Sequence, residues 1–134
     1  MEAIQRDRAA SMEKGMRRFT GRLTREQRAR LSTWASGLEP TSGLALEQRR
    51  DWQAQFAQAL SIRNDRPAFE TAMDRLLDPG AHQSESYRSR MQANRNHTLE
   101  TLATIHRLAS KRQLARTQDR LAELTEDLEQ LTCG

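Results

Sequence analysis

The sequence predicts an all-α protein, and three observations support this. Hydrophobic residues make up 36% of the 134 residues, aromatic residues 4% and charged residues 30%, a balance typical of helices that each bury one narrow apolar stripe. Val and Ile are too scarce for a sheet, and no run alternates apolar and polar residues between hairpin turns. Apolar residues instead recur every three or four positions. We expect five or six helices, in an antiparallel bundle or curved stack.

The length is typical of a single domain, and no long linker divides the chain, so we expect residues 1–134 to form one helical domain. Its core is expected to be thin and rich in leucine. The apolar stripes place eleven residues in it, namely Phe19, Leu31, Trp34, Trp52, Phe56, Phe69, Leu76, Leu102, Leu121, Leu124 and Leu128.

The first two helices have clear boundaries. Helical periodicity runs from about residue 3 to residue 19, and Gly21 is placed where a left-handed residue closes a helix. Thr24 follows Leu23 and precedes Gln27 by three positions, which is the pattern of a capping box, where each side chain binds a backbone N–H of the other residue. The helix that this box opens is expected to end at Gly37.

Two further helices are expected in the middle of the chain. After a turn over residues 39–43, the third helix carries Trp52 and Phe56 on one face. Asp65 and Pro67 indicate the start of a fourth helix, because Asp caps helices and Pro is tolerated in the first turn. The segment Asp78-Pro79-Gly80 ends it.

The last third of the chain leaves one alternative open. A helix is expected from Ser84 or Ser86 onward, with polar Asn94 and Thr98 in the middle of its apolar stripe. Ser110 and Gln113 repeat the capping-box pattern, which predicts a new helix; alternatively, Ser110 is a bend inside one long arm. Beyond it, positions 114, 117, 121, 124, 128 and 131 have the three-four spacing of a packing seam, with leucine at every one except Thr117.

No catalytic apparatus is recognisable, so we expect neither enzyme activity nor a cofactor. The three histidines, His82, His97 and His106, form no metal-binding pattern, and no glycine-rich phosphate loop occurs. Cys133 is the only cysteine, so an internal disulfide is excluded and a free thiol is expected.

Charge is unevenly distributed along the chain. Residues 1–30 contain nine Arg or Lys against four acids, whereas residues 119–134 contain five acids against Arg120. Arg17, Arg18, Arg22 and Arg25 form a candidate basic binding face, as phosphate recognition requires. Asp7, Glu13 and Glu26 interrupt this region, and no recognition helix or stacking aromatics accompany it, which favours a solvated surface over nucleic-acid binding.

Several segments together resemble the C-terminal part of a family of uncharacterised bacterial helical lipoproteins with a domain of unknown function. They are 17–28, Trp34, 38–40, 49–53, 76–79, 87–88, 94–95 and 121–128. The resemblance implies a periplasmic, membrane-associated protein without an assigned activity. Such relatives begin with a lipoprotein signal, an anchoring cysteine and a further helical half, none of which is found in these 134 residues. We therefore expect either the C-terminal part of a longer lipoprotein or a shortened relative, with membrane association only through that absent anchor.

Leu23-Thr24-x-x-Gln27 is also similar to the Leu-Thr-x-x-Gln signature of the periplasmic chaperones of the Spy and CpxP type, and Ala109-Ser110-x-x-Gln113 is a degenerate second copy. Our leading hypothesis is a non-enzymatic interaction module of the bacterial cell envelope that binds a protein partner. One alternative is an ATP-independent, Spy-like chaperone that holds unfolded clients, and another is a nucleic-acid-binding module that uses the basic N-terminal third. Self-association is left open.

Overall fold

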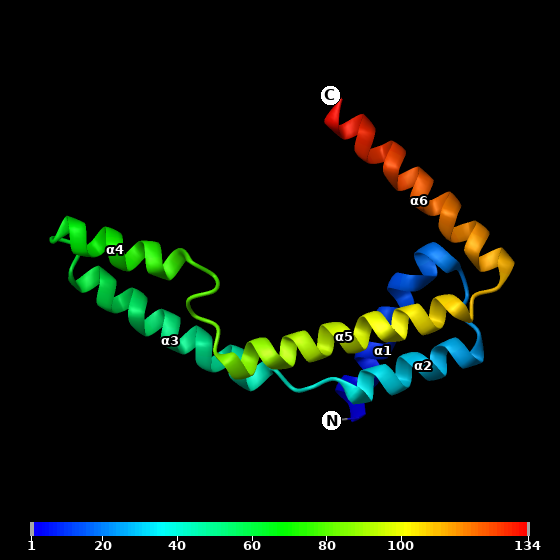
Figure 1. Ribbon diagram of the computed structural model, residues 1–134, viewed down its shortest axis with the longest axis horizontal. Coiled ribbons are helices and arrows are strands. Elements are labelled where there is room, and N and C mark those ends of the chain that lie inside the picture. Colours follow the sequence, from blue (N-terminus) through cyan, green and yellow to red (C-terminus); the bar gives the residue numbers. More distant parts are fainter. Residues whose placement is uncertain (1, 134) are drawn as a thin grey trace. The chain divides into compact units, whose positions relative to one another are not determined.

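The computed structural model describes residues 2–133 and consists of helices joined by short connections (Figure 1). They are α1 (Glu2–Thr20), α2 (Arg25–Gly37), α3 (Ser42–Ser61), α4 (Arg66–Leu77), α5 (Glu85–Arg107) and α6 (Lys111–Thr132). No strand occurs in the described part of the chain, which confirms the predicted all-α class. Within residues 2–133, no helix combines the length and the apolar character needed to cross a membrane.

The chain divides into two compact units. Unit 1 comprises the residues up to Leu38 together with those from Asn96 onward, and unit 2 comprises Glu39–Arg95. Unit 1 therefore contains α1, α2, the C-terminal part of α5, and α6, whereas unit 2 contains α3, α4 and the beginning of α5.

Local sequence signals set the helix ends in unit 1. Gly21, with φ of +75°, follows the last residue of α1, in the left-handed conformation that glycine adopts without strain. Thr24 and Ser110 are the N-caps of α2 and α6, each with the extended backbone of an N-cap. Because α5 ends at Arg107 and α6 begins at Lys111, Ser110 starts a new helix and is not a bend within one arm.

The core of unit 1 is small. Leu23, Leu31 and Ile105 are buried together, and the half-buried Ala9, Met12 and Met16 of α1 pack against them. Trp34 on α2 is buried and donates its indole N–H to Thr98 Oγ1 on α5 over 2.9 Å. Thr98, one of the two polar residues in the middle of the α5 stripe, therefore accepts a hydrogen bond from a tryptophan.

Unit 2 is built on the hairpin of α3 and α4, in which Ala59 and Leu76 are buried. Trp52 stacks on Phe56, with ring centroids 5.3 Å apart, and donates its indole N–H to the Leu76 carbonyl over 3.0 Å. The Asp65 side chain accepts from the Ala68 N–H and Pro67 lies in the first turn of α4, as the sequence predicted. The Asn94 side chain binds both the N–H and the carbonyl of Glu39, at 2.7 and 3.0 Å.

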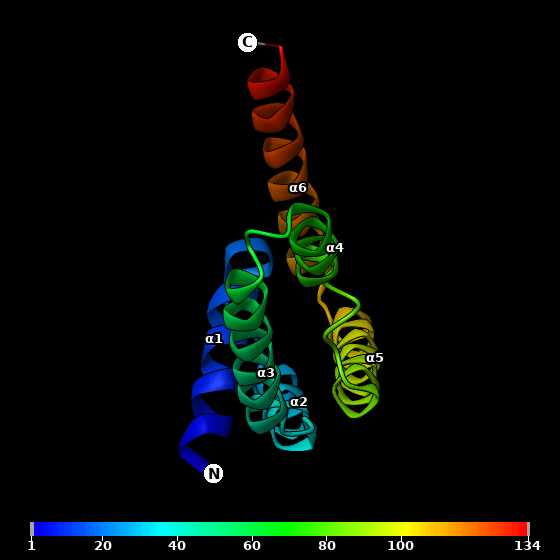
Figure 2. The ribbon, with the colours of Figure 1, turned by 90° about the vertical axis from the view of Figure 1, so that its left-hand side faces the viewer.

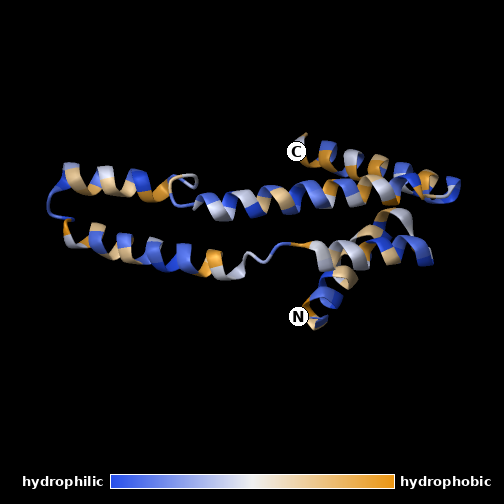
Figure 3. Ribbon diagram, turned by 60° about the horizontal axis from the view of Figure 1, so that its bottom comes forward, coloured by the Kyte–Doolittle hydropathy of each residue, from blue (hydrophilic) through white to orange (hydrophobic). Residues whose placement is uncertain are grey.

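The predicted core is wrong at its C-terminal end. Leu121 and Leu128 are exposed, with 51% and 62% of their surface accessible, and Leu124 is only half-buried. The reason is that α6 runs beyond the other helices of unit 1, so the second half of its seam has no helix against it (Figures 1 and 2). Hydrophobic residues nevertheless recur along α6 to its end (Figure 3).

The remaining core predictions divide into two groups. Leu31, Trp34 and Leu76 are buried as expected. Five others are half-buried, namely Phe19, Trp52, Phe56, Phe69 and Leu102. Leu23, Ala35, Ala59 and Ile105 complete the buried hydrophobic set and were not among the predicted core residues.

Candidate anion-binding surface

Both capping boxes are closed by reciprocal hydrogen bonds. In the first box, Thr24 Oγ1 accepts from the Gln27 N–H over 3.2 Å, and Gln27 Oε1 accepts from the Thr24 N–H over 2.9 Å. In the second, Ser110 Oγ accepts from the Gln113 N–H over 3.1 Å, and Gln113 Oε1 accepts from the Ser110 N–H over 3.0 Å. Each box satisfies one otherwise unpaired N–H near its helix start and the N–H of its N-cap residue.

A pair of buried glutamines joins the two boxes. The side-chain amide nitrogens of Gln27 and Gln113 each donate to the Oε1 of the other residue over 3.0 Å. Gln113 Nε2 also donates to the Arg22 carbonyl over 3.0 Å. Because both side chains are buried, their polar atoms would be costly to leave unpaired, and this network fixes the start of α6 against the start of α2.

The joined boxes bring two basic stretches to one end of unit 1. Each of the four predicted arginines is exposed there, with Arg17 and Arg18 in the last turn of α1, Arg22 in the connection and Arg25 at the start of α2. The end of α5 and the start of α6 add four more exposed cations, which were not predicted, namely Arg107, Lys111, Arg112 and Arg116. We call these eight residues the basic end.

The signal that identifies the second stretch is the absence of acids. Residues 14–25 contain no Asp or Glu, and neither do residues 101–118. Neither stretch is unusual by itself. Only their proximity in the structure distinguishes them from other basic segments. Among the ion pairs of the described residues, those of Arg30, Arg66 and Arg120, none involves the basic end.

Three of these cations are at positions that the helix dipole disfavours. Arg25 occupies the first residue of α2, and Lys111 and Arg112 the first two residues of α6, where the N-terminal dipole favours negative charge. The first turn of α6 contains no acid to offset them. A bound anion would therefore interact favourably with both the side chains and the helix starts.

A pocket of about 370 Å³ lies between the two helix starts. It is lined by Gly21, by the hydroxyl residues Thr20, Thr24 and Ser110, by Gln113, and by three arginines, Arg22, Arg112 and Arg116. Arg116 lies across Gly21 so closely that a Cβ at that position would come within 3.0 Å of its Nη1. Arginine and hydroxyl donors are the groups that bind phosphate and carboxylate oxygens.

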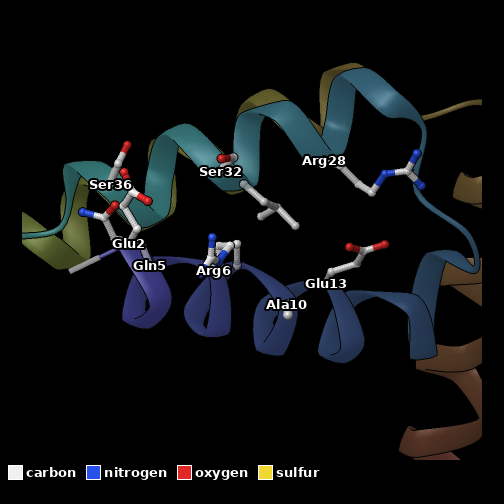
Figure 4. A pocket seen from close by; sticks show the side chains of 10 residues that line it. Glu2, Gln5, Arg6, Ala10, Glu13, Arg28, Ser32 and Ser36 are labelled. Carbon is white, nitrogen blue, oxygen red and sulfur yellow. The ribbon is translucent and has the colours of Figure 1, made fainter.

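Unit 1 also contains a groove between α1 and α2 and a buried histidine nitrogen. The groove of about 430 Å³ between α1 and α2 is lined by Ala10 and Glu13 of α1 and by Arg28 and Ser32 of α2 (Figure 4). His97 packs against Gly37, where a Cβ would come within 2.7 Å of its Nε2, and that nitrogen is buried without a hydrogen-bond partner. Among residues 2–133, no three acids, histidines or cysteines gather in a group that could hold a metal ion.

Comparison with known protein families identifies one match. A family described as a family of unknown function, DUF6279, matches residues 1–88. The chain belongs to this family. The match covers α1 to α4 and ends near the start of α5, so the α6 half of the basic end lies outside it. No curated protein and no solved structure matches this DUF6279 chain.

Proposed function

We propose that this DUF6279 protein is a non-enzymatic interaction module of the bacterial cell envelope that binds an anionic partner through its basic end. The observation that carries the proposal is the convergence of eight exposed cations, from two acid-free stretches, around a buried glutamine pair. Membrane association would come from the anchor that the lipoprotein resemblance implies. We favour an acidic protein surface as the partner.

The residue types and the positions of the eight cations of the basic end support this proposal. Seven of the eight cations are arginine, whose planar guanidinium binds carboxylate and phosphate oxygens in pairs. Placing three of them at helix starts opposes the helix dipole, so stability does not explain their positions. The network of Gln27, Gln113 and the Arg22 carbonyl holds the two stretches together before any ligand binds.

Two alternative functions are also proposals, and each predicts a different ligand. A Spy-like chaperone would bind unfolded chains, which the exposed leucines of α6 could contact. A nucleic-acid-binding module would use the same cations for phosphates. A single titration series with three probes distinguishes them, namely a fluorescent polyglutamate peptide, a DNA oligonucleotide and a reduced, unfolded client protein.

We expect the polyglutamate peptide to bind at low salt and to weaken steeply as salt is added, since exposed charge pairs are screened. Changing Arg17, Arg18, Arg22 and Arg25 to Gln should weaken binding at least about tenfold, and so should changing Arg107, Lys111, Arg112 and Arg116 to Gln, because both sets form one surface. The matched control replaces four exposed arginines of unit 2, Arg49, Arg50, Arg75 and Arg88, with Gln.

This control changes the net charge equally but leaves the basic end intact, so binding should change less than about twofold. Absence of polyglutamate binding at low salt would overturn the proposal, as would equal losses in all three variants. Tighter binding of DNA than of the peptide would favour the nucleic-acid alternative. Binding of the unfolded client that does not respond to salt would favour the chaperone.

A further inference from the structure

The second half of α6 presents a row of leucines to solvent. Leu121, Leu128 and Leu131 have 51%, 62% and 78% of their surface accessible, and Leu124 is half-buried. We call these four residues the leucine seam. Isolated exposed leucines are common on protein surfaces, but four in register on one helix face indicate a surface that another molecule covers.

The residues around the seam are arranged for helix pairing. The leucines occupy alternating three- and four-residue steps, the spacing of the two apolar positions of a coiled coil. The flanking positions are Gln118, Thr125 and Thr132 on one side and Arg120 and Asp127 on the other. The remaining acids, Asp119, Glu123, Glu126 and Glu129, fall on the outer face, so Asp127 is the only acid of this segment that a like helix would meet.

We propose that the leucine seam binds the leucine seam of a second copy of this chain, with the two α6 helices antiparallel. In this register Leu121 faces Leu131 of the second copy and Leu124 faces its Leu128, so all four layers are leucine against leucine. A basic partner helix is less suitable, because the flanks of the seam present only one acid, Asp127, beside one arginine, Arg120.

The start of α6 decides the orientation. There α6 contacts α1, and the first two positions of the same seam, Leu114 and Thr117, are half-buried. In a parallel dimer, α1 of the second copy would lie beside α1 of the first copy at the start of the paired α6 helices. In an antiparallel dimer, α6 of the second copy ends near residue 121, where the seam of the first copy is exposed. Four leucine layers form a small interface, so dimerisation should depend on concentration.

Analytical ultracentrifugation of the full chain over a series of concentrations tests the proposal. We expect a reversible monomer–dimer equilibrium that Leu124→Glu and Leu128→Glu together abolish. The matched control is Leu77→Glu, which changes a leucine of unit 2 with 69% of its surface accessible and should leave the equilibrium unchanged. Circular dichroism should show the same helix content in every variant, because the replaced residues are not buried.

Asp127→Asn tests the orientation. In the antiparallel register Asp127 lies beside Asp127 of the second copy, so removing both charges should tighten the dimer about two- to fivefold at low salt. In a parallel pair Asp127 would lie beside Thr132, and the change would have no effect. A monomer at every concentration, a dimer that survives the double glutamate variant, or an Asp127→Asn dimer of unchanged affinity would each overturn the proposal.

Discussion

Units 1 and 2 bury their side chains to different degrees. Unit 1 buries Leu23, Leu31 and Ile105 together, although α1 and α2 are less hydrophobic than α3 and α4. In unit 2, α3 and α4 each contribute a single buried residue, Ala59 and Leu76. Burial therefore follows the number of helices that meet at a point, because a pair of helices covers only one side of each apolar stripe.

The polar interactions differ in the same way. Each unit contains one tryptophan whose indole N–H is paired, to the Thr98 hydroxyl in unit 1 and to the Leu76 carbonyl in unit 2. Unit 1 also buries the Gln27–Gln113 pair, which connects positions 86 residues apart. The described hydrogen bonds of unit 2 include no corresponding pair of buried side chains. We infer that unit 1 depends more strongly on each of its internal contacts than unit 2 does.

The largest expected difference is between Leu31→Ala and Leu76→Ala. Leu31 is 2% exposed within a three-residue cluster, and its truncation should cost about 3 kcal/mol, whereas Leu76, 5% exposed in a two-helix hairpin that can close around the gap, should cost about 2 kcal/mol. Urea unfolding followed by tryptophan fluorescence measures both costs. Leu31→Ala is made in a Trp52→Phe background, so that Trp34 reports on unit 1, and Leu76→Ala in a Trp34→Phe background, so that Trp52 reports on unit 2. An equal or larger cost for Leu76→Ala would contradict the comparison.

The second-largest expected change in stability comes from substitutions in the Gln27–Gln113 pair. Gln27→Leu should destabilise unit 1 by about 2 kcal/mol, because it removes a bond to the Thr24 N–H and takes one of two partners from each polar side-chain atom of the buried Gln113. The double change of Gln27 and Gln113 to Leu should cost less than the sum of the two single changes, since either single change already removes the two hydrogen bonds between the glutamines. Strict additivity in the double-mutant cycle would show that the pair is not coupled.

The smallest effects concern the two caps. Thr24→Ala and Ser110→Ala should each cost about 1 kcal/mol, because a helix-start N–H loses its partner while apolar packing is unchanged. Glycine at either position should cost less than alanine, by the usual ranking of N-cap residues. Asp65→Ala, the matching cap change in unit 2, provides the comparison in the other unit. A stabilising Ser110→Ala would mean that α5 and α6 form one continuous helix in solution.

The sequence by itself determined the local features of this protein. Caps, helix ends and the all-α class depend on residues at most four positions apart, and Thr24, Gln27, Asp65, Ser110 and Gln113 occupy the predicted roles. The same locality explains the error in α6. Its leucine spacing identifies a seam, but spacing within one helix carries no information about whether a second helix covers Leu121 and Leu128.

Only the tertiary structure decided which distant segments meet. Arg17 and Arg25 were identifiable as a basic face, but their union with Arg112 and Arg116 depends on the hydrogen bonds of Gln113 to Gln27 and to the Arg22 carbonyl. Each capping box is closed by hydrogen bonds between residues three positions apart in the sequence. The buried side-chain amide of each box is paired instead with the other box, which is distant in the sequence. A buried amide must find a donor and an acceptor, and folding supplies them from 86 residues away.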